Sequence, residues 1–273
     1  MNMIACGNRV DVLDVYVEDV EGTKSFYEKV FGLPATRHPD CVDFTFGDTI
    51  LHLRDVSSAA EFIGPAEVAS SADGSRGVFT IFVADVDAAC AELARRGVGL
   101  VNGPADRSWG LRTACFADPA GQIWELAALR EDGVPGSGAG ARTWDGTEKR
   151  IGSIALFVED LQRAQSFYRD GFGLPAGHDS HDFADFRFDR MTIRLLDIPR
   201  ARQLVEPATV AGPADGLRFT FCVFVENVDA VLDELADCGV QLFKGPVDMS
   251  FGHRIASVRD PGGHIWEVVG QIS

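Results

Sequence analysis

The stretch that decides the fold is Val15-Tyr-Val-Glu-Asp-Val-Glu-Gly-Thr-Lys-Ser-Phe-Tyr-Glu-Lys-Val-Phe-Gly-Leu-Pro34. It occurs a second time as Leu156-Phe-Val-Glu-Asp-Leu-Gln-Arg-Ala-Gln-Ser-Phe-Tyr-Arg-Asp-Gly-Phe-Gly-Leu-Pro175. Further along, residues 83–126 recur as residues 225–268 without a gap. Self-similarity at a fixed spacing constrains the architecture before any helix or strand is assigned. The sequence therefore predicts a tandem duplication.

A fainter repeat lies inside each half, because residues 12–20 and 78–86 share one pattern of alternating apolar side chains that leads into a helical pattern. Alternation over so few residues, rich in β-branched side chains, is typical of a strand. In the helical segment that follows, Phe26, Tyr27 and Val30 share one face, and Gly32 is a typical helix stop. With the short strands that come next, the order βαβββ is predicted four times.

The predicted domain boundaries follow from this repeat. We expect a first domain at 8–129, a flexible linker at 130–149 and a second domain at 150–271. The linker contains Gly-Val-Pro-Gly-Ser-Gly-Ala-Gly and has no apolar period. Such a composition is typical of an exposed flexible segment.

Composition excludes several classes of protein. The net charge of −16 argues against nucleic acid and anionic membranes as partners, because both favour a basic surface. No apolar run approaches the roughly 20 residues that a membrane-spanning helix needs. The 6 cysteines show no CxxC pair, so we interpret them as reduced and structural. We expect a cytoplasmic protein whose partner is a neutral or cationic small molecule.

The βαβββ order occurs together with two motifs in each half. The first is VxDxxxxxxFY…GLP, and the second is GP…S(W/F)GxR…DPxGxxWE. In both features the chain resembles the vicinal-oxygen-chelate superfamily, the glyoxalase/bleomycin-resistance/dioxygenase type. The resemblance implies an α+β fold in which four βαβββ modules pair into two domains, each with a cleft. In this superfamily the cleft holds either a divalent metal or a molecule bound without one.

The resemblance also indicates where metal ligands would stand. These positions are Val12, His52, Val78 and Glu125 in the first half, and Ser153, Arg194, Thr220 and Glu267 in the second. Valine cannot ligate, arginine stays cationic and hydroxyls are weak ligands, whereas metal sites usually need three or four protein ligands. Pairing of modules across the halves would not help, because Val12 and His52 would then join Thr220 and Glu267. We therefore expect no metal and no other cofactor.

Strand parity predicts which other side chains face the clefts, because alternate residues of a strand point to opposite faces. Together with the metal-ligand positions that the resemblance implies and the Ser-(Trp/Phe)-Gly loops, it gives a set of candidate ligand-binding residues: Val12, Asp14, Tyr16, His52, Thr80, Trp109, Glu125, Ser153, Phe157, Arg194, Thr220, Phe251 and Glu267. With each half forming its own cleft, the first would be acidic through Asp14, His52 and Glu125, and the second would contain the cation of Arg194. A cationic aromatic ligand would then prefer the first.

Three functions fit these residues. The favoured one is metal-independent binding and sequestration of an aromatic small molecule, such as an antibiotic or aromatic polyketide, in self-resistance or biosynthesis. The alternative is an enzyme of the same fold, of the lyase, isomerase or dioxygenase type, in which Glu125 and His52 would be the acid–base groups. A purely structural module would leave the clefts unexplained. The sequence leaves open a monomer with two packed domains or a homodimer.

Overall fold

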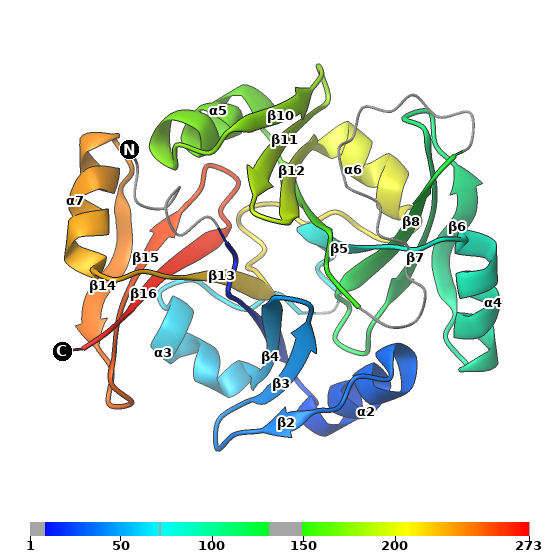
Figure 1. Cartoon of the computed structure of the whole chain (residues 1–273), viewed down its shortest axis with the longest axis horizontal. Coiled ribbons are helices and arrows are strands. Elements are labelled where there is room, and N and C mark those ends of the chain that lie inside the picture. Colours follow the sequence, from blue (N-terminus) through cyan, green and yellow to red (C-terminus); the bar gives the residue numbers. More distant parts are fainter. Residues whose placement is uncertain (1–8, 71, 131–148, 273) are drawn as a thin grey trace.

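The computed structural model describes residues 9–70, 72–130 and 149–272, and within them the βαβββ order occurs four times, as predicted (Figure 1). The first module contains β1 (Val12–Val17), α2 (Val20–Phe31), β2 (Thr36–Arg37), β3 (Val42–Phe46) and β4 (Thr49–Asp55). The second contains β5 (Gly77–Phe82), α4 (Val86–Arg95), β6 (Leu100–Asp106), β7 (Leu111–Ala117) and β8 (Ile123–Leu129).

The third module contains β9 (Ser153–Val158), α5 (Leu161–Ser166) continued by η2 (Phe167–Gly171), β10 (Ala176–Asp179), β11 (Phe183–Phe188) and β12 (Met191–Asp197). The fourth contains β13 (Phe219–Phe224), α7 (Val228–Asp237), β14 (Leu242–Asp248), β15 (His253–Arg259) and β16 (Ile265–Gln271). Short helices that the sequence pattern did not indicate follow β4 and β12: η1 (Val56–Ser58), α3 (Ala59–Ile63) and α6 (Ile198–Val205).

Local signals explain where the module helices begin and end. The side chain of Asp19 accepts a hydrogen bond from the Gly22 amide and caps α2, and Asn227 caps α7 in the same way. Gly32 ends α2 with φ of 60°, a left-handed conformation that glycine adopts at no steric cost. No helix among the described residues is long and apolar enough to cross a membrane.

Within each half, the two modules pack back to back around aromatic side chains. The ring of Phe31 on α2 lies 4.7 Å from that of Trp124 on β8. The Tyr27 hydroxyl donates a 2.8 Å hydrogen bond to Asp118, in the turn before β8. Tyr168 and Asp260 repeat this bond at 2.7 Å in the second half. The Phe-Tyr and Asp-Pro motifs are therefore joined to each other in the core of each half.

The sheets, by contrast, are completed across the halves. Strand β1 pairs antiparallel with β13, and β5 pairs antiparallel with β9. The result is two eight-stranded sheets, of which the first has the order β14-β15-β16-β13-β1-β4-β3-β2 and the second β10-β11-β12-β9-β5-β8-β7-β6. Figure 1 shows the blue first module beside the orange-red last module, with the two middle modules together on the opposite side. This is the cross-half pairing that the sequence left open.

The predicted strand parity fits this arrangement. Leu13, Val15 and Val17 are buried in the main core, so the alternate residues of β1 face the concave side of the first sheet. The boundaries predicted at 8–129 and 150–271 remain a prediction. Most of the predicted linker, residues 131–148, lies outside the described residues.

Candidate functional site

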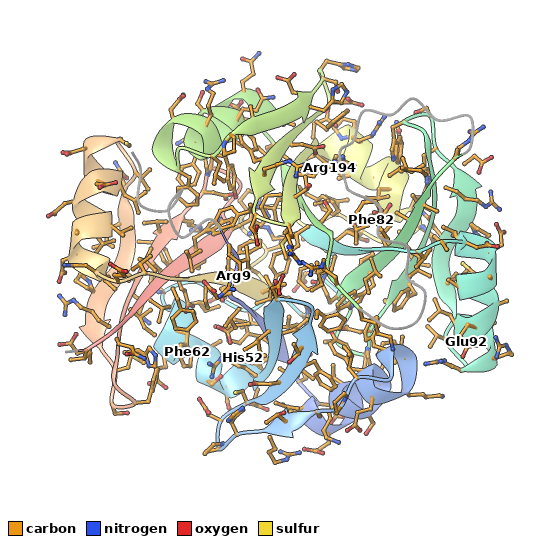
Figure 2. All side chains as sticks on the ribbon, viewed as in Figure 1. Arg9, His52, Phe62, Phe82, Glu92 and Arg194 are labelled. Atoms are coloured by element: carbon orange, nitrogen blue, oxygen red, sulfur yellow. The ribbon has the colours of Figure 1, made fainter. Side chains whose placement is uncertain are left out.

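A hollow lies on the face of the second sheet that carries Thr80 and Glu125. It has a volume of about 570 Å³ and is formed by β5, β8, β9, β12, α6 and the loop between β6 and β7. Its lining includes Thr80, Phe82, Arg107, Trp109, Glu125, Ser153, His178, Phe183, Arg194 and Arg200. Figure 2 labels two of these side chains, Arg194 on β12 and Phe82 on β5. We call this hollow the arginine cavity, since 4 of its lining residues are arginines.

Polar side chains form one wall of the arginine cavity. Thr80 donates a 2.8 Å hydrogen bond to Glu125 and is paired with Ser153 across the β5–β9 junction. Burial raises the pKa of Glu125, while the bond from Thr80 and the charge of Arg194 act in the opposite direction. Arg194 is fixed by two bonds of 2.6 and 2.7 Å to Asp185, its cross-strand neighbour. The wall thus presents a buried carboxyl group close to a fixed cation.

An indole forms another wall. Trp109 lies in the loop between β6 and β7, where Gly110 turns the backbone with φ of 82°. The guanidinium of Arg200, on α6, lies 3.8 Å from the centroid of the Trp109 ring, and that of Arg107 lies 5.8 Å away. Trp109 is only partly buried and lines the cavity, although it also packs against the small apolar cluster beneath it. It therefore has an exposed face that a ligand can contact.

The first sheet holds the corresponding second site, a buried polar network that we call the carboxylate cluster: Asp14, His52, Arg54, Cys222 and Glu267. Asp14 accepts hydrogen bonds from Arg54 and from Cys222, whose thiol is 3.2 Å away, and it lies 3.0 Å from His52 Nδ1. Cys222 Sγ is also 3.6 Å from Glu267. The carboxylate cluster is closed off by Arg54, whose guanidinium stacks over Phe62 of α3 at 4.4 Å.

The two carboxyl groups of the carboxylate cluster have pKa values that are shifted in opposite directions. Burial and the negative charge of Asp14 raise the pKa of Glu267 to about 8. Burial disfavours ionisation of Asp14 as well, but the bond to His52 and the charge of Arg54 outweigh it and lower the pKa of Asp14 to about 2. Tyr16 lies beside this pair, and its buried hydroxyl has no hydrogen-bond partner among the described residues. Near neutral pH the cluster therefore holds one ionised and one protonated carboxyl group.

The residues of neither site suit a resident divalent metal. One candidate group combines His52 with Cys41 and Asp43, but burial raises the pKa of the Cys41 thiol to about 12, which disfavours the thiolate that would bind a metal. Oxygen and sulfur atoms of Asp14, Cys222 and Glu267 lie within 4.8 Å of one another, so the geometry alone would permit an ion. However, Asp14 already binds the Arg54 guanidinium, and burial raises the pKa values of both Cys222 and Glu267. A metal would have to replace this cation and remove two protons. On the second sheet the four family positions are occupied by Val78, Glu125, Ser153 and Arg194, and of these only Glu125 is a strong metal ligand.

The structure corrects how the predicted residues were grouped. Glu125 was expected beside Asp14 and His52, but β8 belongs to the second sheet, and Glu125 lies with Ser153 and Arg194 instead. The acidic first cleft of the sequence-based expectation therefore does not form from these three residues. The reason is the antiparallel pairing of β1 with β13 and of β5 with β9, which exchanges modules between the halves.

The remaining predicted residues have different environments. Thr80, Trp109, Glu125, Ser153 and Arg194 line the arginine cavity. Thr220 donates a 3.4 Å bond to Glu267 beside the carboxylate cluster. Three of the predicted residues belong to neither site: Val12 packs beside Cys222 in a small apolar cluster, Phe157 packs in the apolar cluster beneath Trp109, and Phe251 is 49% exposed and lies against His253.

Sequence reasoning missed several residues of these sites. Arg54 lies two residues after His52, on the same strand face, so parity contained the signal for it. Arg107 lies two residues before Trp109 in one loop. Arg200 lies on α6, a helix that the sequence pattern did not indicate. Its approach to Trp109 depends on cross-half pairing and had no local signal.

Comparison with known proteins gives the same fold. Maize glyoxalase I matches with a TM-score of 0.69 and 18% identity, over 96% of this chain and 92% of that one. A putative dioxygenase of Bacillus subtilis matches with a TM-score of 0.63 and 18% identity, over 96% and 85%. At such identities the likeness is one of fold.

Two curated relatives match in sequence. The anthracycline biosynthesis protein DauV of Streptomyces sp. (strain C5) is 26% identical over 94% of this chain and 90% of its own length. The uncharacterized protein YraH of Bacillus subtilis is 30% identical over 42% of this chain and 93% of its own length. The family model described as Glyoxalase/Bleomycin resistance protein/Dioxygenase superfamily matches residues 9–126 and 150–268. The chain therefore belongs to the glyoxalase/bleomycin resistance protein/dioxygenase superfamily and contains its domain twice.

Proposed function

We propose that this protein binds a planar aromatic small molecule of the polyketide type in the arginine cavity, without a metal, in the biosynthesis of that compound or in protection against it. The observation that carries the proposal is the cavity itself. Its volume of about 570 Å³ lies within the roughly 300–1,000 Å³ of small-molecule sites. Trp109, Phe82 and Phe183 supply aromatic surface, and the polar groups converge on one wall.

The curated relative in anthracycline biosynthesis supports the choice of ligand class, because anthracyclines are planar aromatic polyketides and the match spans nearly both chains. A cytoplasmic location is part of the proposal. The 5 cysteines in the described part of the chain are free thiols, which suits a reducing compartment.

A second candidate is an enzyme that moves a proton on the bound molecule. The observation that favours it is Glu125, which lines the arginine cavity with a raised pKa and is therefore suited to proton transfer near neutral pH. Its hydrogen bond from Thr80 would orient the carboxyl group toward a ligand. A Glu125→Gln variant that still binds but loses all turnover of the bound compound would favour this candidate over simple sequestration.

The test of the proposed function is the substitution Trp109→Ala, measured for both affinity and stability. Loss of an aromatic stacking partner costs about 0.5–1.5 kcal/mol, so the affinity for an anthracycline aglycone, measured by calorimetry, should fall about two- to tenfold. The free energy of unfolding should decrease by only about 1 kcal/mol, since Trp109 is partly exposed and the variant loses its contact with Arg200 and part of the packing against the apolar cluster beneath it.

The matched control is Phe251→Ala, at the equivalent position of the other sheet, where the ring is 49% exposed. That variant should change neither quantity. A stability loss of about 3–5 kcal/mol in Trp109→Ala with unchanged affinity would identify a core residue and remove Trp109 from the site. No binding of the aglycone to the wild-type protein would overturn the proposed function.

A further inference from the structure

The charge of the arginine cavity is opposite to that of the whole chain. The chain has a net charge of −16, yet Arg107, Arg130, Arg194 and Arg200 all line this one hollow. The carboxyl groups in the lining are those of Glu125 and Asp182. Charges separated by more than about 10 Å are largely screened in physiological salt, so a bound ligand responds to the lining more than to the distant surface.

The arginines differ in how their charges are compensated. Arg194 is paired with Asp185, and Arg200 forms a 2.9 Å ion pair with Asp182. Arg107 instead donates to three neutral oxygens: Thr113 Oγ1 at 2.8 Å, Asn102 Oδ1 at 2.6 Å and the Gln203 carbonyl at 3.1 Å. Among the described residues, no carboxylate lies within ion-pair distance of its guanidinium. Arg107 is thus held rigidly with its charge available to a ligand.

Mutual repulsion supports this view of the cavity. Burial lowers the pKa of Arg200, Asp182 opposes that effect, and the positive charges of Arg194 and Arg107 lower it further. The guanidinium groups of Arg107 and Arg194 are therefore close enough to that of Arg200 to repel it. An anion placed among them would relieve the repulsion and form charge-assisted hydrogen bonds.

The duplicated sequence supplies an internal comparison. A shift of 142 residues aligns Thr49–Asp55 with Met191–Asp197 and Ile123–Leu129 with Ile265–Gln271. Continued past the ends of these strands, the same shift places the four arginines opposite His52, Ser58, Met249 and Ile272. None of these four side chains carries a permanent positive charge. The hollow of about 320 Å³ on the first sheet has Met249, Phe62 and Val247 in its lining. The cluster of arginines is therefore a property of one cavity and not of the repeated fold.

We propose that the arginine cavity selects an aromatic anion, and that Arg107 determines this selectivity. The ring of the ligand lies against Trp109, and an acidic oxygen, either a carboxylate or an ionised phenol, faces Arg107. Both Arg107 and Arg200 lie within 6 Å of the Trp109 ring centroid, so a substituent on a ring stacked there is within their reach. This inference rests on the proposed function and adds that the ligand is an anion. The net charge of the chain, taken alone, suggests a cationic or neutral ligand instead.

The experiment compares two planar probes of nearly equal shape, anthraquinone-2-carboxylate and anthraquinone-2-carboxamide, by calorimetry at pH 7. We expect the wild-type protein to bind the carboxylate at least tenfold more tightly. Arg107→Gln should abolish this preference while the affinity for the carboxamide stays within about twofold, and Arg107→Lys should restore part of it. Arg254→Gln is the control, because Arg254 pairs with Asp229 and Asp248 on the other sheet and lies outside the cavity.

The outcomes separate the two proposals. Equal affinity of the wild-type protein for both probes would overturn the anion inference and leave the proposed function standing. This comparison uses the wild-type protein alone and so does not depend on the folding of a variant. Binding of neither probe would overturn the anion inference, and the proposed function falls with it only when the anthracycline aglycone does not bind either. An additional titration with the hydroxyanthraquinone alizarin from pH 5 to 9 distinguishes the two acidic oxygens. Affinity that rises through the pKa of its phenol assigns an ionised phenol, whereas constant affinity together with the carboxylate preference assigns a carboxylate.

Discussion

Replacing Glu267 by glutamine should change the pH dependence of stability in one direction only. Glu267 is buried in the carboxylate cluster, and burial together with the charge of Asp14 raises its pKa from 4.5 to about 8. In the unfolded chain the same group ionises near pH 4.5. Between these two values the folded protein keeps a proton that the unfolded protein has lost. The free energy of unfolding contributed by Glu267 therefore decreases as the pH rises from about 4.5 to about 8.

The size of the effect follows from the same shift. Each unit of pKa difference corresponds to about 1.4 kcal/mol, so the full shift amounts to a few kcal/mol. A glutamine is neutral at every pH and resembles the protonated glutamic acid in shape. We expect Glu267→Gln and the wild-type protein to have nearly equal stability at pH 5. At pH 9 the variant should be more stable by a few kcal/mol.

The assay is urea unfolding followed by circular dichroism at several pH values from 5 to 9. The difference between the two proteins isolates Glu267 from the other titrating groups. Glu125→Gln is the matched control. Burial raises the pKa of Glu125, but the hydrogen bond from Thr80 and the charge of Arg194 lower it, so the difference in stability between this variant and the wild type should depend less on pH. A Glu267→Gln curve that runs parallel to that of the wild type at all pH values would refute the reasoning.

Two further predictions concern ligands, and one concerns the core. Elemental analysis of the purified protein should find no stoichiometric divalent metal, and a chelator should leave the melting temperature unchanged; about one metal per chain, lost together with ligand binding, would contradict this. Glu125→Gln should change the affinity for an anthracycline aglycone severalfold while Glu267→Gln leaves it unchanged, because Glu125 lines the arginine cavity and Glu267 lies in the other sheet; equal effects in calorimetry would be inconsistent with the arginine cavity as the site. Tyr27→Phe should lower the free energy of unfolding by about 1–3 kcal/mol in urea titration, because it leaves the buried Asp118 carboxyl without its hydroxyl donor, and an unchanged value would contradict the bond.

The fold was predictable from sequence because its signals are local and are repeated four times. Strand alternation and the glycine stop at Gly32 each act within a few residues, and both patterns recur along the chain. The pairing of modules was not predictable, because each half contains the same module types. Either pairing satisfies the hydrophobic pattern of β1, and only the antiparallel contacts of β1 with β13 settle the choice.

The candidate site was predictable residue by residue but not as an assembly. Parity assigned Thr80 and Ser153 to cleft faces, the family resemblance added Glu125 and Arg194, and these residues do line one cavity. Which of them share a cavity depends on contacts between residues as distant as Thr80 and Ser153. The positive charge around Trp109 also depends on the tertiary structure, because Arg200 belongs to the other half of the chain.

The crossed arrangement of modules has a consequence for how the two sites can differ. Two separate copies of one half would form an isologous pair, in which every substitution appears in both sites by symmetry. Joining the halves in a single polypeptide removes that constraint, because each half contributes different modules to each sheet. A substitution at position 194 then alters one cavity, while its counterpart at position 52 stays a histidine. One covalent connection thus allows a pseudosymmetric scaffold to hold two unlike interiors, one lined by guanidinium groups and one closed around carboxyl groups.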